Sequence, residues 1–388
     1  MKVCLLSDAI LPPLTGIGRY AWELAQGIER NPEIESRRYL GYRGKQTFDE
    51  LQRVASACDT SQQQSGLTSP ARKAAISARV RAWLINWRIV SAVYQAKQSF
   101  EYHRHLADAN HWVVHGPNYH IPEKVPSRTR RIVTVHDLST FIGPQWHPSE
   151  RVRRMDTVLP LALAAADRII TDAVSTAELL VSDFAVARER IESIPLGVDS
   201  IFFAPEPLPR EPFTLCVSTI EPRKNIGTLL RCYRSLPDDL RRAFPLVLVG
   251  EYGWRSHDEH ASIREGVAEG WLEYQGFVSE TALVDLYQRA RLCVYPSLHE
   301  GFGLPLLEAF AAGAPVLAGN HTSIPEVAGG HARLLDDVTD IDEMREAIRA
   351  ELSAPWDRVA ASERVTQARK YSWAATVEKT IACYRSLV

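Results

Sequence analysis

Two glutamates separated by seven residues bracket a short glycine turn in the segment Glu300-Gly-Phe-Gly-Leu-Pro-Leu-Leu-Glu308. Apolar residues at helical spacing follow the glycines, and a proline suits the first turn of a helix, where its missing N–H costs nothing. The free N–H groups and partial positive charge of such a helix end favour a phosphate. With an acid on either side to bind hydroxyls, the segment predicts a site for a sugar, a diphosphate and a ribose, the parts of a nucleotide-sugar. The residues expected at this helix end are Gly301, Phe302, Gly303 and Leu304.

Two cations lie in the segment Glu221-Pro-Arg-Lys-Asn225, between a predicted strand at 214–217 and a predicted helix at 226–234. At that position Lys224 can meet a diphosphate as a point charge, and Arg223 can meet it as a two-pronged donor. Taken alone, the segment is more typical of two ordinary surface cations.

His136 and Asp137 follow an apolar strand, at the end where an α/β sheet presents functional side chains. The imidazole can hydrogen-bond a substrate hydroxyl, and the carboxylate can orient the imidazole or the loop. A single His-Asp pair is more often structural. His115 ends another strand, and we expect it to line the same region without a specific role.

Glycines recur in the segment Thr15-Gly-Ile-Gly-Arg-Tyr-Ala21, which matches a dinucleotide-binding pattern only loosely. Eight residues, two of them prolines, separate Ser7 from Gly16, whereas the dinucleotide fingerprint turns directly off its strand. We expect Gly16 and Gly18 to form a flexible loop, ending at a helix, that can approach a phosphate or an acceptor closely. A plain turn is the alternative.

The composition is that of a globular protein with two domains: 388 residues, 45% hydrophobic, 24% charged and a formal net charge of −2. No apolar run reaches the roughly 20 residues that a membrane-spanning helix needs. No signal peptide is expected, and six scattered cysteines suggest neither a disulfide framework nor a zinc site, so a cytoplasmic protein is predicted. Asp340 and Asp342 have the spacing of metal ligands, but acids at a helix start serve as caps, and no metal is predicted.

Apolar runs separated by helical stretches predict two parallel sheets covered by helices, a doubly wound α/β architecture. A proline-rich linker at 204–212 separates the two sets. The segment Ser175-Thr-Ala-Glu178 has the pattern of a capping box and predicts a helix start. The expected strands are Val3–Ser7, Trp112–His115, Ile132–Val135, Arg168–Thr171, Ile191–Ile194, Thr214–Val217, Leu246–Gly250, Leu272–Gln275, Leu292–Tyr295 and Pro315–Ala318.

Residues 70–105 depart from this alternation, because seven cations and one acid are interleaved there with Trp83 and Trp87. A basic helix with tryptophans can lie on an anionic membrane surface, which here would be the inner membrane. A solvated helix whose aromatic side packs on the first domain is the alternative.

In the order and spacing of these segments the chain resembles the retaining glycosyltransferases of family 4, which have the GT-B fold. The resemblance covers nearly the whole chain, including Ile194-Pro-Leu-Gly-Val-Asp199, Tyr295-Pro-Ser-Leu-His-Glu300 and Ser323-Ile-Pro-Glu-Val327. It implies two Rossmann-like domains facing a central cleft: an acceptor-binding domain at 1–205 and a nucleotide-sugar domain at 206–371. A C-terminal helix at 372–388 should then pack back on the first domain. Transfer would need no metal and no cofactor.

The resemblance also assigns roles to single residues. Glu300 would hold hydroxyls of the donor sugar and Glu308 the ribose, while backbone amides at 302–304 and Lys224 would hold the diphosphate. His136 would contact the sugar near the reacting carbon, and Gly16 or Gly18 would line the phosphates. Many relatives have a further cation where this chain has Thr219, so Arg223, Lys224 or another group must balance the diphosphate.

Retention without a well-placed carboxylate nucleophile implies same-face attack, in which the departing phosphate helps to take the acceptor proton. Of the family, the chain looks most like bacterial mannosyl- and rhamnosyltransferases of O-antigen, lipopolysaccharide or capsule assembly. That similarity implies a GDP-mannose or GDP-rhamnose donor and a lipid-linked glycan acceptor, with no role for nucleic acid. A UDP-sugar donor is the first alternative. More remote are a sugar-nucleotide epimerase, a catalytically inactive glycan-binding scaffold and a nicotinamide-dependent dehydrogenase.

Overall fold

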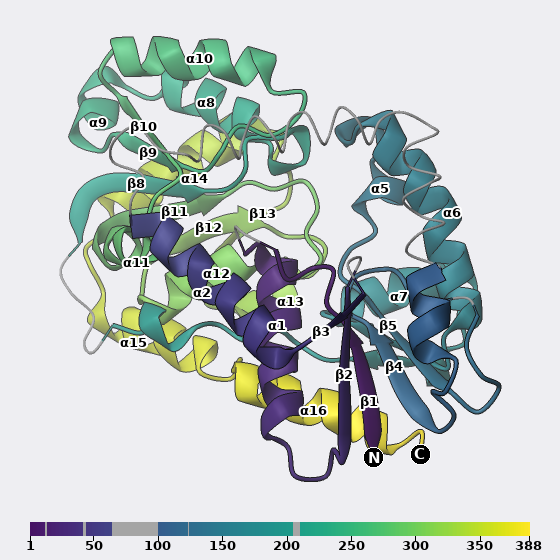
Figure 1. Ribbon diagram of the computed structural model, residues 1–388. Helices are drawn as coiled ribbons and strands as arrows, with labels where there is room; N and C mark the ends of the chain where they lie inside the picture. The colour runs from purple at the N-terminus through teal and green to yellow at the C-terminus, as the bar shows by residue number, and fades with distance from the viewer. Residues whose placement is uncertain (12–13, 42–43, 64–99, 123, 205–209) are drawn as a thin grey trace.

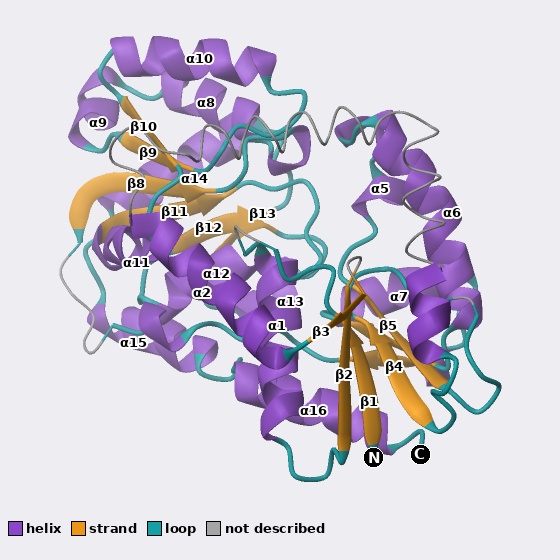
Figure 2. Ribbon diagram, in the orientation of Figure 1, coloured by secondary structure: helices purple, strands orange, loops and turns teal. Residues whose placement is uncertain are grey.

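The computed structural model describes residues 1–11, 14–41, 44–63, 100–122, 124–204 and 210–388. Two α/β domains lie side by side, each with a mostly parallel sheet between helices (Figure 1; Figure 2). This is the doubly wound GT-B architecture expected from the sequence.

The N-terminal sheet has the strand order β3-β2-β1-β4-β5-β6-β7 over the described residues. All its neighbouring strands are parallel except the edge pair β2 and β3. Its central strands are apolar on both faces because helices cover both sides. The strands are β1 (Lys2–Leu6), β2 (Ser36–Gly41), β3 (Gly44–Gln46), β4 (Trp112–Gly116), β5 (Arg130–Val135), β6 (Arg168–Thr171) and β7 (Ile191–Ser193).

The C-terminal sheet has the strand order β10-β9-β8-β11-β12-β13, and every neighbouring pair is parallel. In both domains the strand order reverses beside the first strand, and ligands of such sheets bind beyond the carboxyl ends of the strands at that point. The strands are β8 (Glu211–Val217), β9 (Leu246–Val249), β10 (Leu272–Gly276), β11 (Ala290–Tyr295), β12 (Val316–Gly319) and β13 (Arg333–Leu335).

All ten strands expected from apolar runs are present, with ends that differ by a few residues. Three strands were not expected: β2, β3 and β13. They lie at or beside sheet edges, and β2 begins with Ser36, Arg37 and Arg38, so their sequences lack the continuous apolar run of a central strand.

Helices connect the strands. In the N-terminal half they are α1 (Gly16–Arg30), α2 (Phe48–Gln63), α5 (Ser139–Ile142), α6 (Ser149–Ala165) and α7 (Val174–Phe184), with 3₁₀ turns η1 (Pro144–Trp146), η2 (Arg188–Arg190) and η3 (Ser200–Phe202). In the C-terminal half they are η4 (Pro222–Lys224), α8 (Ile226–Ser235), α9 (Asp238–Ala243), α10 (His257–Ala268), α11 (Glu280–Arg289), α12 (Leu304–Ala311), α13 (Ile324–Ala328), α14 (Ile341–Ser353), α15 (Arg358–Ala368) and α16 (Trp373–Arg385).

The capping box expected at 175–178 is wrong. Helix α7 begins at Val174, and its N-cap is Ala173, two residues before the expected cap Ser175; alanine has no side chain able to accept a hydrogen bond. Ser175 therefore lies inside the first turn. By contrast Asp340 caps α14 as expected, with its carboxylate accepting from the N–H groups of Asp342 and Glu343 at 2.8 and 3.1 Å.

The last helix, α16, follows the C-terminal domain in sequence but packs on the N-terminal one (Figure 1). Tyr384 of this helix hydrogen-bonds Nδ1 of His115 at 2.7 Å, and Thr134 holds the other ring nitrogen at 2.8 Å. His115 is fully buried, and burial lowers its pKa to about 3. The expectation that it lines a binding region is therefore wrong, because it links α16 to the core of the first domain.

Two segments singled out in the sequence lie wholly or largely outside the described residues. Most of the basic, tryptophan-containing stretch at 70–105 falls within 64–99, and the proline-rich linker contains 205–209. At its far end the linker is shorter than expected, since Glu211 and Pro212 already belong to β8. In the ranges that can be described, no helix combines the length and apolar character required to span a bilayer.

Candidate functional site

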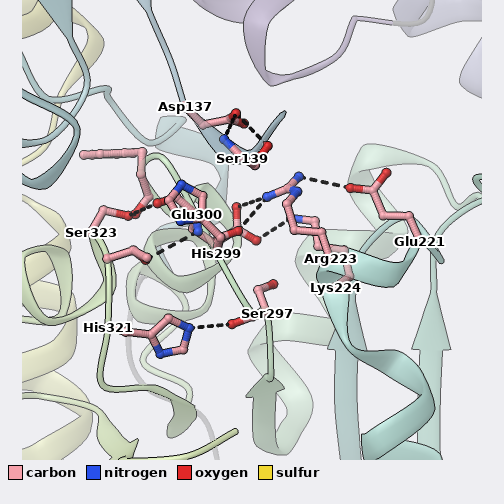
Figure 3. A network of polar contacts seen from close by, with 12 residues as sticks. Asp137, Ser139, Glu221, Arg223, Lys224, Ser297, His299, Glu300, His321 and Ser323 are labelled. Carbon is pink, nitrogen blue, oxygen red and sulfur yellow. Dashed lines mark hydrogen bonds and ion pairs between the residues drawn. The ribbon is translucent and has the colours of Figure 1, made fainter. Parts of the chain in front are cut away.

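The centre of the candidate site is a buried carboxylate held by two cations. Oε1 of Glu300 accepts from Nζ of Lys224 at 2.5 Å, and Oε2 accepts from Nη1 of Arg223 at 3.0 Å (Figure 3). Arg223 also donates to the carbonyl of His299 at 2.7 Å and to Glu221 at 3.1 Å. The structure thus brings Glu300 together with two adjacent cations that lie 76 and 77 positions before it in the chain.

Local backbone structure explains how these cations face the glutamate. Strand β8 ends at Val217, and the chain then forms the 3₁₀ turn η4, which Pro222 starts because its φ suits a helical first position. Asn225 adopts a left-handed conformation with φ 56°, and its side chain donates to the carbonyl of Val338 at 2.8 Å. This turn separates η4 from α8 and leaves both cations at the carboxyl end of the sheet.

The charges around Glu300 determine its protonation. Burial by itself raises the pKa of this carboxyl, but Lys224 and Arg223 outweigh burial and hold the pKa well below its usual range. Glu300 is therefore an anion that must exchange partners when a ligand takes one of the cations. The ring of Tyr295 lies beside the same ammonium, 5.4 Å from Nζ of Lys224 to the ring centroid.

The glycine turn after Glu300 forms the predicted helix end. Gly303 has φ 115°, which favours glycine, and α12 begins directly after it. The hydroxyl of Ser323 donates to the carbonyls of Glu300 and Phe302 at 3.1 and 2.8 Å and so fixes the loop. Among the residues described, no hydrogen bond uses the N–H groups of Phe302, Gly303 or Leu304. These amides are the anion-binding groups expected from the sequence.

The two domains touch directly at Gly301. A Cβ atom placed on this glycine would lie 1.8 Å from the carbonyl oxygen of His136 and 2.8 Å from Cβ of Asp137. Only a residue without a side chain allows the end of β5 and the turn at 300–303, the donor-side loop of the predicted site, to approach this closely.

We therefore expect Gly301→Ala to lower turnover by about 100-fold or more, since a displacement of about 1 Å in such a site has effects of this size. The added methyl meets backbone of the other domain, so each domain should still fold. Turnover and thermal unfolding of the variant test this. Gly227→Ala in α8 is the matched control, because its Cβ meets the ends of two flexible side chains, the carboxylate of Glu259 at 3.2 Å and the guanidinium of Arg231 at 3.6 Å. Normal turnover in Gly301→Ala would contradict the proposed approach of the domains.

His136 lies across this junction from Glu300, but both its ring nitrogens already have partners. Nδ1 is 2.7 Å from Oδ2 of Asp172, and Nε2 is 2.8 Å from the carbonyl of Pro117. Burial lowers the pKa of this imidazole, but the carboxylate and carbonyl raise it more, so the charged ring is favoured. The ring can reach a donor sugar only by exchanging one of these partners, whereas its backbone carbonyl already faces Gly301.

Asp137, next in the chain, accepts from the N–H and hydroxyl of Ser139 at 3.0 and 2.8 Å. Its pKa is raised by burial but lowered more by Arg223 and by these hydrogen bonds, so the group is ionised. Two buried histidines near it, His147 and His299, have ring nitrogens without hydrogen-bond partners in the described part of the chain. Such groups mark a polar region that a ligand can complete.

Glu308 belongs to α12 but not to the Glu300 cluster. Its carboxylate accepts from the hydroxyl of Tyr287 at 3.0 Å. Burial is the main cause that raises the pKa of this group to about 7, despite the opposing hydrogen bond. The two glutamates thus occupy different electrostatic environments, one strongly ionised and the other near its titration midpoint at neutral pH.

The two N-terminal glycines are not in a loop, as the sequence suggested, but in the first turn of α1, which Thr15 caps through the N–H of Gly18 at 3.3 Å. Gly16 faces the other domain, since a Cβ there would lie 3.3 Å from Cδ1 of Leu304. Gly18 instead packs within its own domain, since a Cβ placed on it would lie 2.9 Å from the carbonyl oxygen of Ala9. Only Gly16 therefore lies beside the predicted phosphate-binding turn.

Several residues of the site were missed in the sequence. Asp172 follows strand β6 just as Asp137 follows β5, and its place after an apolar strand is the signal that could have revealed it. Glu221, Tyr287 and the hydroxyl of Ser323 have no comparable signal, because their roles arise from contacts between distant segments. No group of three or more potential metal ligands occurs among the described residues.

Comparisons with known proteins identify the family of the chain. The family model described as glycosyl transferases group 1 matches residues 198–370. The O-antigen chain mannosyltransferase B of Escherichia coli is 33% identical over 399 aligned positions, covering the whole of both chains. The GDP-mannose-dependent alpha-(1-6)-phosphatidylinositol monomannoside mannosyltransferase of Mycolicibacterium smegmatis is 29% identical, covering 67% of this chain and 79% of that protein.

Among solved structures, sucrose-phosphate synthase from Thermosynechococcus elongatus superposes with a TM-score of 0.68 at 18% identity, covering 100% of this chain and 99% of that one. A likeness at this identity concerns the fold. With the full-length match to a curated relative, it shows that this chain belongs to the glycosyltransferases of group 1 with the GT-B fold.

Proposed function

We propose that the protein transfers a mannose-type hexose, with retention, from a GDP-sugar to a lipid-linked glycan in cell-surface polysaccharide synthesis. The observation that carries this proposal is the ionised Glu300 held by Lys224 and Arg223 beside unused backbone amides. Two mannosyltransferases among the relatives support the hexose, and the name of one of them includes GDP-mannose. A rhamnose-type GDP-sugar or a UDP-sugar is the alternative donor.

In this proposal the diphosphate binds where the cations and amides converge. Leaving-group departure builds negative charge on the β-phosphate, and fixed N–H groups with a lysine stabilise that charge. Arg223 lies beside Lys224 on the same carboxylate, so it is the group we assign to the cation position that Thr219 leaves empty. Glu300, released by the diphosphate, then accepts hydrogen bonds from the sugar hydroxyls.

The N-terminal domain would contribute the acceptor side of the reaction. His136 and Asp137 lie against Gly301, next to the residue assigned to the sugar. We assign His136 to the region of the reacting carbon, with Asp172 holding its ring. Neither metal nor cofactor enters this scheme, and the departing phosphate takes the acceptor proton in a same-face attack.

A transfer assay with a lipid-linked glycan extract and labelled GDP-mannose, GDP-rhamnose and UDP-glucose tests the proposal. We expect labelled glycan only with a GDP-sugar, and thermal stabilisation by GDP greater than that by UDP or ADP. Release of an isomerised sugar-nucleotide without acceptor would favour an epimerase instead. Binding of glycan without any product would favour the inactive scaffold.

The raised pKa of Glu308 leads to a pH-dependent prediction. A ribose diol donates to an ionised carboxylate more strongly than to a neutral one. Nucleotide binding should therefore lower the pKa of Glu308 from about 7 and release protons near neutral pH, and nucleotide affinity should rise with pH through this range.

Calorimetry in two buffers of different ionisation heat measures the released protons. Because the nucleotide phosphates also titrate, Glu308→Gln is the control, and its proton release should be smaller. Equal proton release by the two proteins would show that Glu308 does not meet the ribose.

A further inference from the structure

A glutamate of one domain caps a helix of the other. Glu326 lies in α13 of the C-terminal domain, and its carboxylate accepts from the N–H of Val174 at 3.0 and 3.3 Å to its two oxygens. Val174 is the first residue of α7, in the N-terminal domain. The contact thus joins residues 152 positions apart across the domain junction.

Helix α7 has no cap of its own. Its N-cap residue is Ala173, and no side chain within the N-terminal domain accepts from its first turn in the described structure. A carboxylate is the group that best satisfies such N–H groups, because it also meets the positive end of the helix dipole. The helix start is therefore complete only while the two domains are together.

Glu326 and Val174 are each close in sequence to a residue that holds one half of the proposed active site. On the C-terminal side, Ser323 precedes Glu326 by three residues in the same short segment, and its hydroxyl fixes the donor-side loop through Glu300 and Phe302. On the N-terminal side, Asp172 precedes Val174 by two residues and hydrogen-bonds His136 at 2.7 Å. The loop and the histidine are thus held by segments that meet at Glu326 and Val174.

We propose that Glu326 is a positioning residue, which sets His136 against the donor-side loop by capping α7 across the domain junction. It acts through Val174 and Asp172 and does not itself touch the sugar-nucleotide. The closeness of Gly301 to the carbonyl of His136 makes the alignment of the domains critical, since neither backbone can yield without opening the junction.

The side chain of Glu326 is solvent-exposed, so its removal leaves no buried cavity and the variant should fold. We expect Glu326→Ala to lower kcat by about three- to tenfold. This is less than the roughly 100-fold loss that a displacement of about 1 Å in an active site can cause. The KM for the donor and the affinity for free GDP should stay unchanged, because the side chains assigned to the ribose and the diphosphate, Glu308, Lys224 and Arg223, all lie within the C-terminal domain. Glu326→Gln, which keeps an oxygen acceptor, should recover part of the loss.

A double variant separates positioning from simple helix capping. Ala173→Ser provides α7 with an N-cap from its own domain. Combined with Glu326→Ala, it should restore thermal stability but leave kcat low, because the domains are still not joined. Recovery of kcat together with stability would overturn the proposal, as would a normal kcat in Glu326→Ala. Glu178→Ala, which removes an exposed acid from the same helix, is the matched control and should leave kcat unchanged.

The proposal does not depend on the identity of the donor. If the transfer assay showed a donor with a base other than guanine, that part of the proposed function would be overturned. The comparison of kcat between the Glu326 variants and the wild type would still hold. The same four variants can be compared with whichever sugar-nucleotide the protein uses.

Discussion

Replacing Glu300 by alanine should abolish detectable transfer while leaving the affinity for free GDP undiminished. On the proposed assignment the variant loses charge-assisted hydrogen bonds to the sugar, each worth roughly 1.5–3 kcal/mol, so a decrease in turnover of more than about 100-fold is expected. The affinity should not fall, because Lys224 and Arg223 lose their internal partner and face the diphosphate unopposed. Calorimetric titration with GDP and a single-turnover transfer assay measure the two effects.

Glu308→Ala is the matched comparison, since it removes a carboxylate eight positions further along the same segment. It should weaken GDP binding, because the carboxylate beside Tyr287 is assigned to the ribose. An equal loss of GDP affinity in both variants would show that the division of labour between the two glutamates is wrong.

Removing the ammonium of Lys224 should affect turnover more than donor binding. Negative charge on the β-phosphate grows as the leaving group departs, so a cation there acts mainly in the transition state. We expect Lys224→Ala to reduce kcat by about 30-fold or more, corresponding to about 2 kcal/mol, with a smaller change in donor affinity. Steady-state kinetics with saturating donor measure this effect.

Two further variants sharpen the test of Lys224. Arg234→Ala removes an exposed cation from the following helix, paired with Glu265 at 2.7 Å, and should leave kcat unchanged. Arg223→Lys keeps the charge but loses the planar guanidinium that bonds Glu300, His299 and Glu221 at once, and an intermediate loss of turnover is expected. If turnover of Lys224→Ala stays within about threefold of wild type, under 1 kcal/mol, the assigned role is wrong.

The sequence by itself was enough to predict the central strands, the two doubly wound sheets and the segments that meet at the site. Apolar runs buried on both faces specify parallel strands that helices must cover. In such sheets ligands bind beyond the carboxyl ends of the strands, so the strand ends in the sequence also predict where the site lies. The glycine turn before α12 was also predictable, because its proline and glycines have local conformational preferences. Strands β2, β3 and β13, which lie at or beside the sheet edges, were missed, since a strand covered on fewer sides needs no continuous apolar run.

Only the tertiary structure decided which partner each of these residues has. Arg223 and Lys224 look like surface cations until the fold places both on Glu300. His115 looks like His136 until their partners are known, since Tyr384 of α16 holds the first, whereas the second lies against Gly301 of the other domain. The start of α7 shows the reason most clearly. A capping box is a local pattern and was expected within the helix sequence, yet the N–H of Val174 bonds to Glu326, 152 residues away. Local preferences select helices and turns, whereas hydrogen bonds and charges are satisfied by whichever groups the packed domains bring within reach.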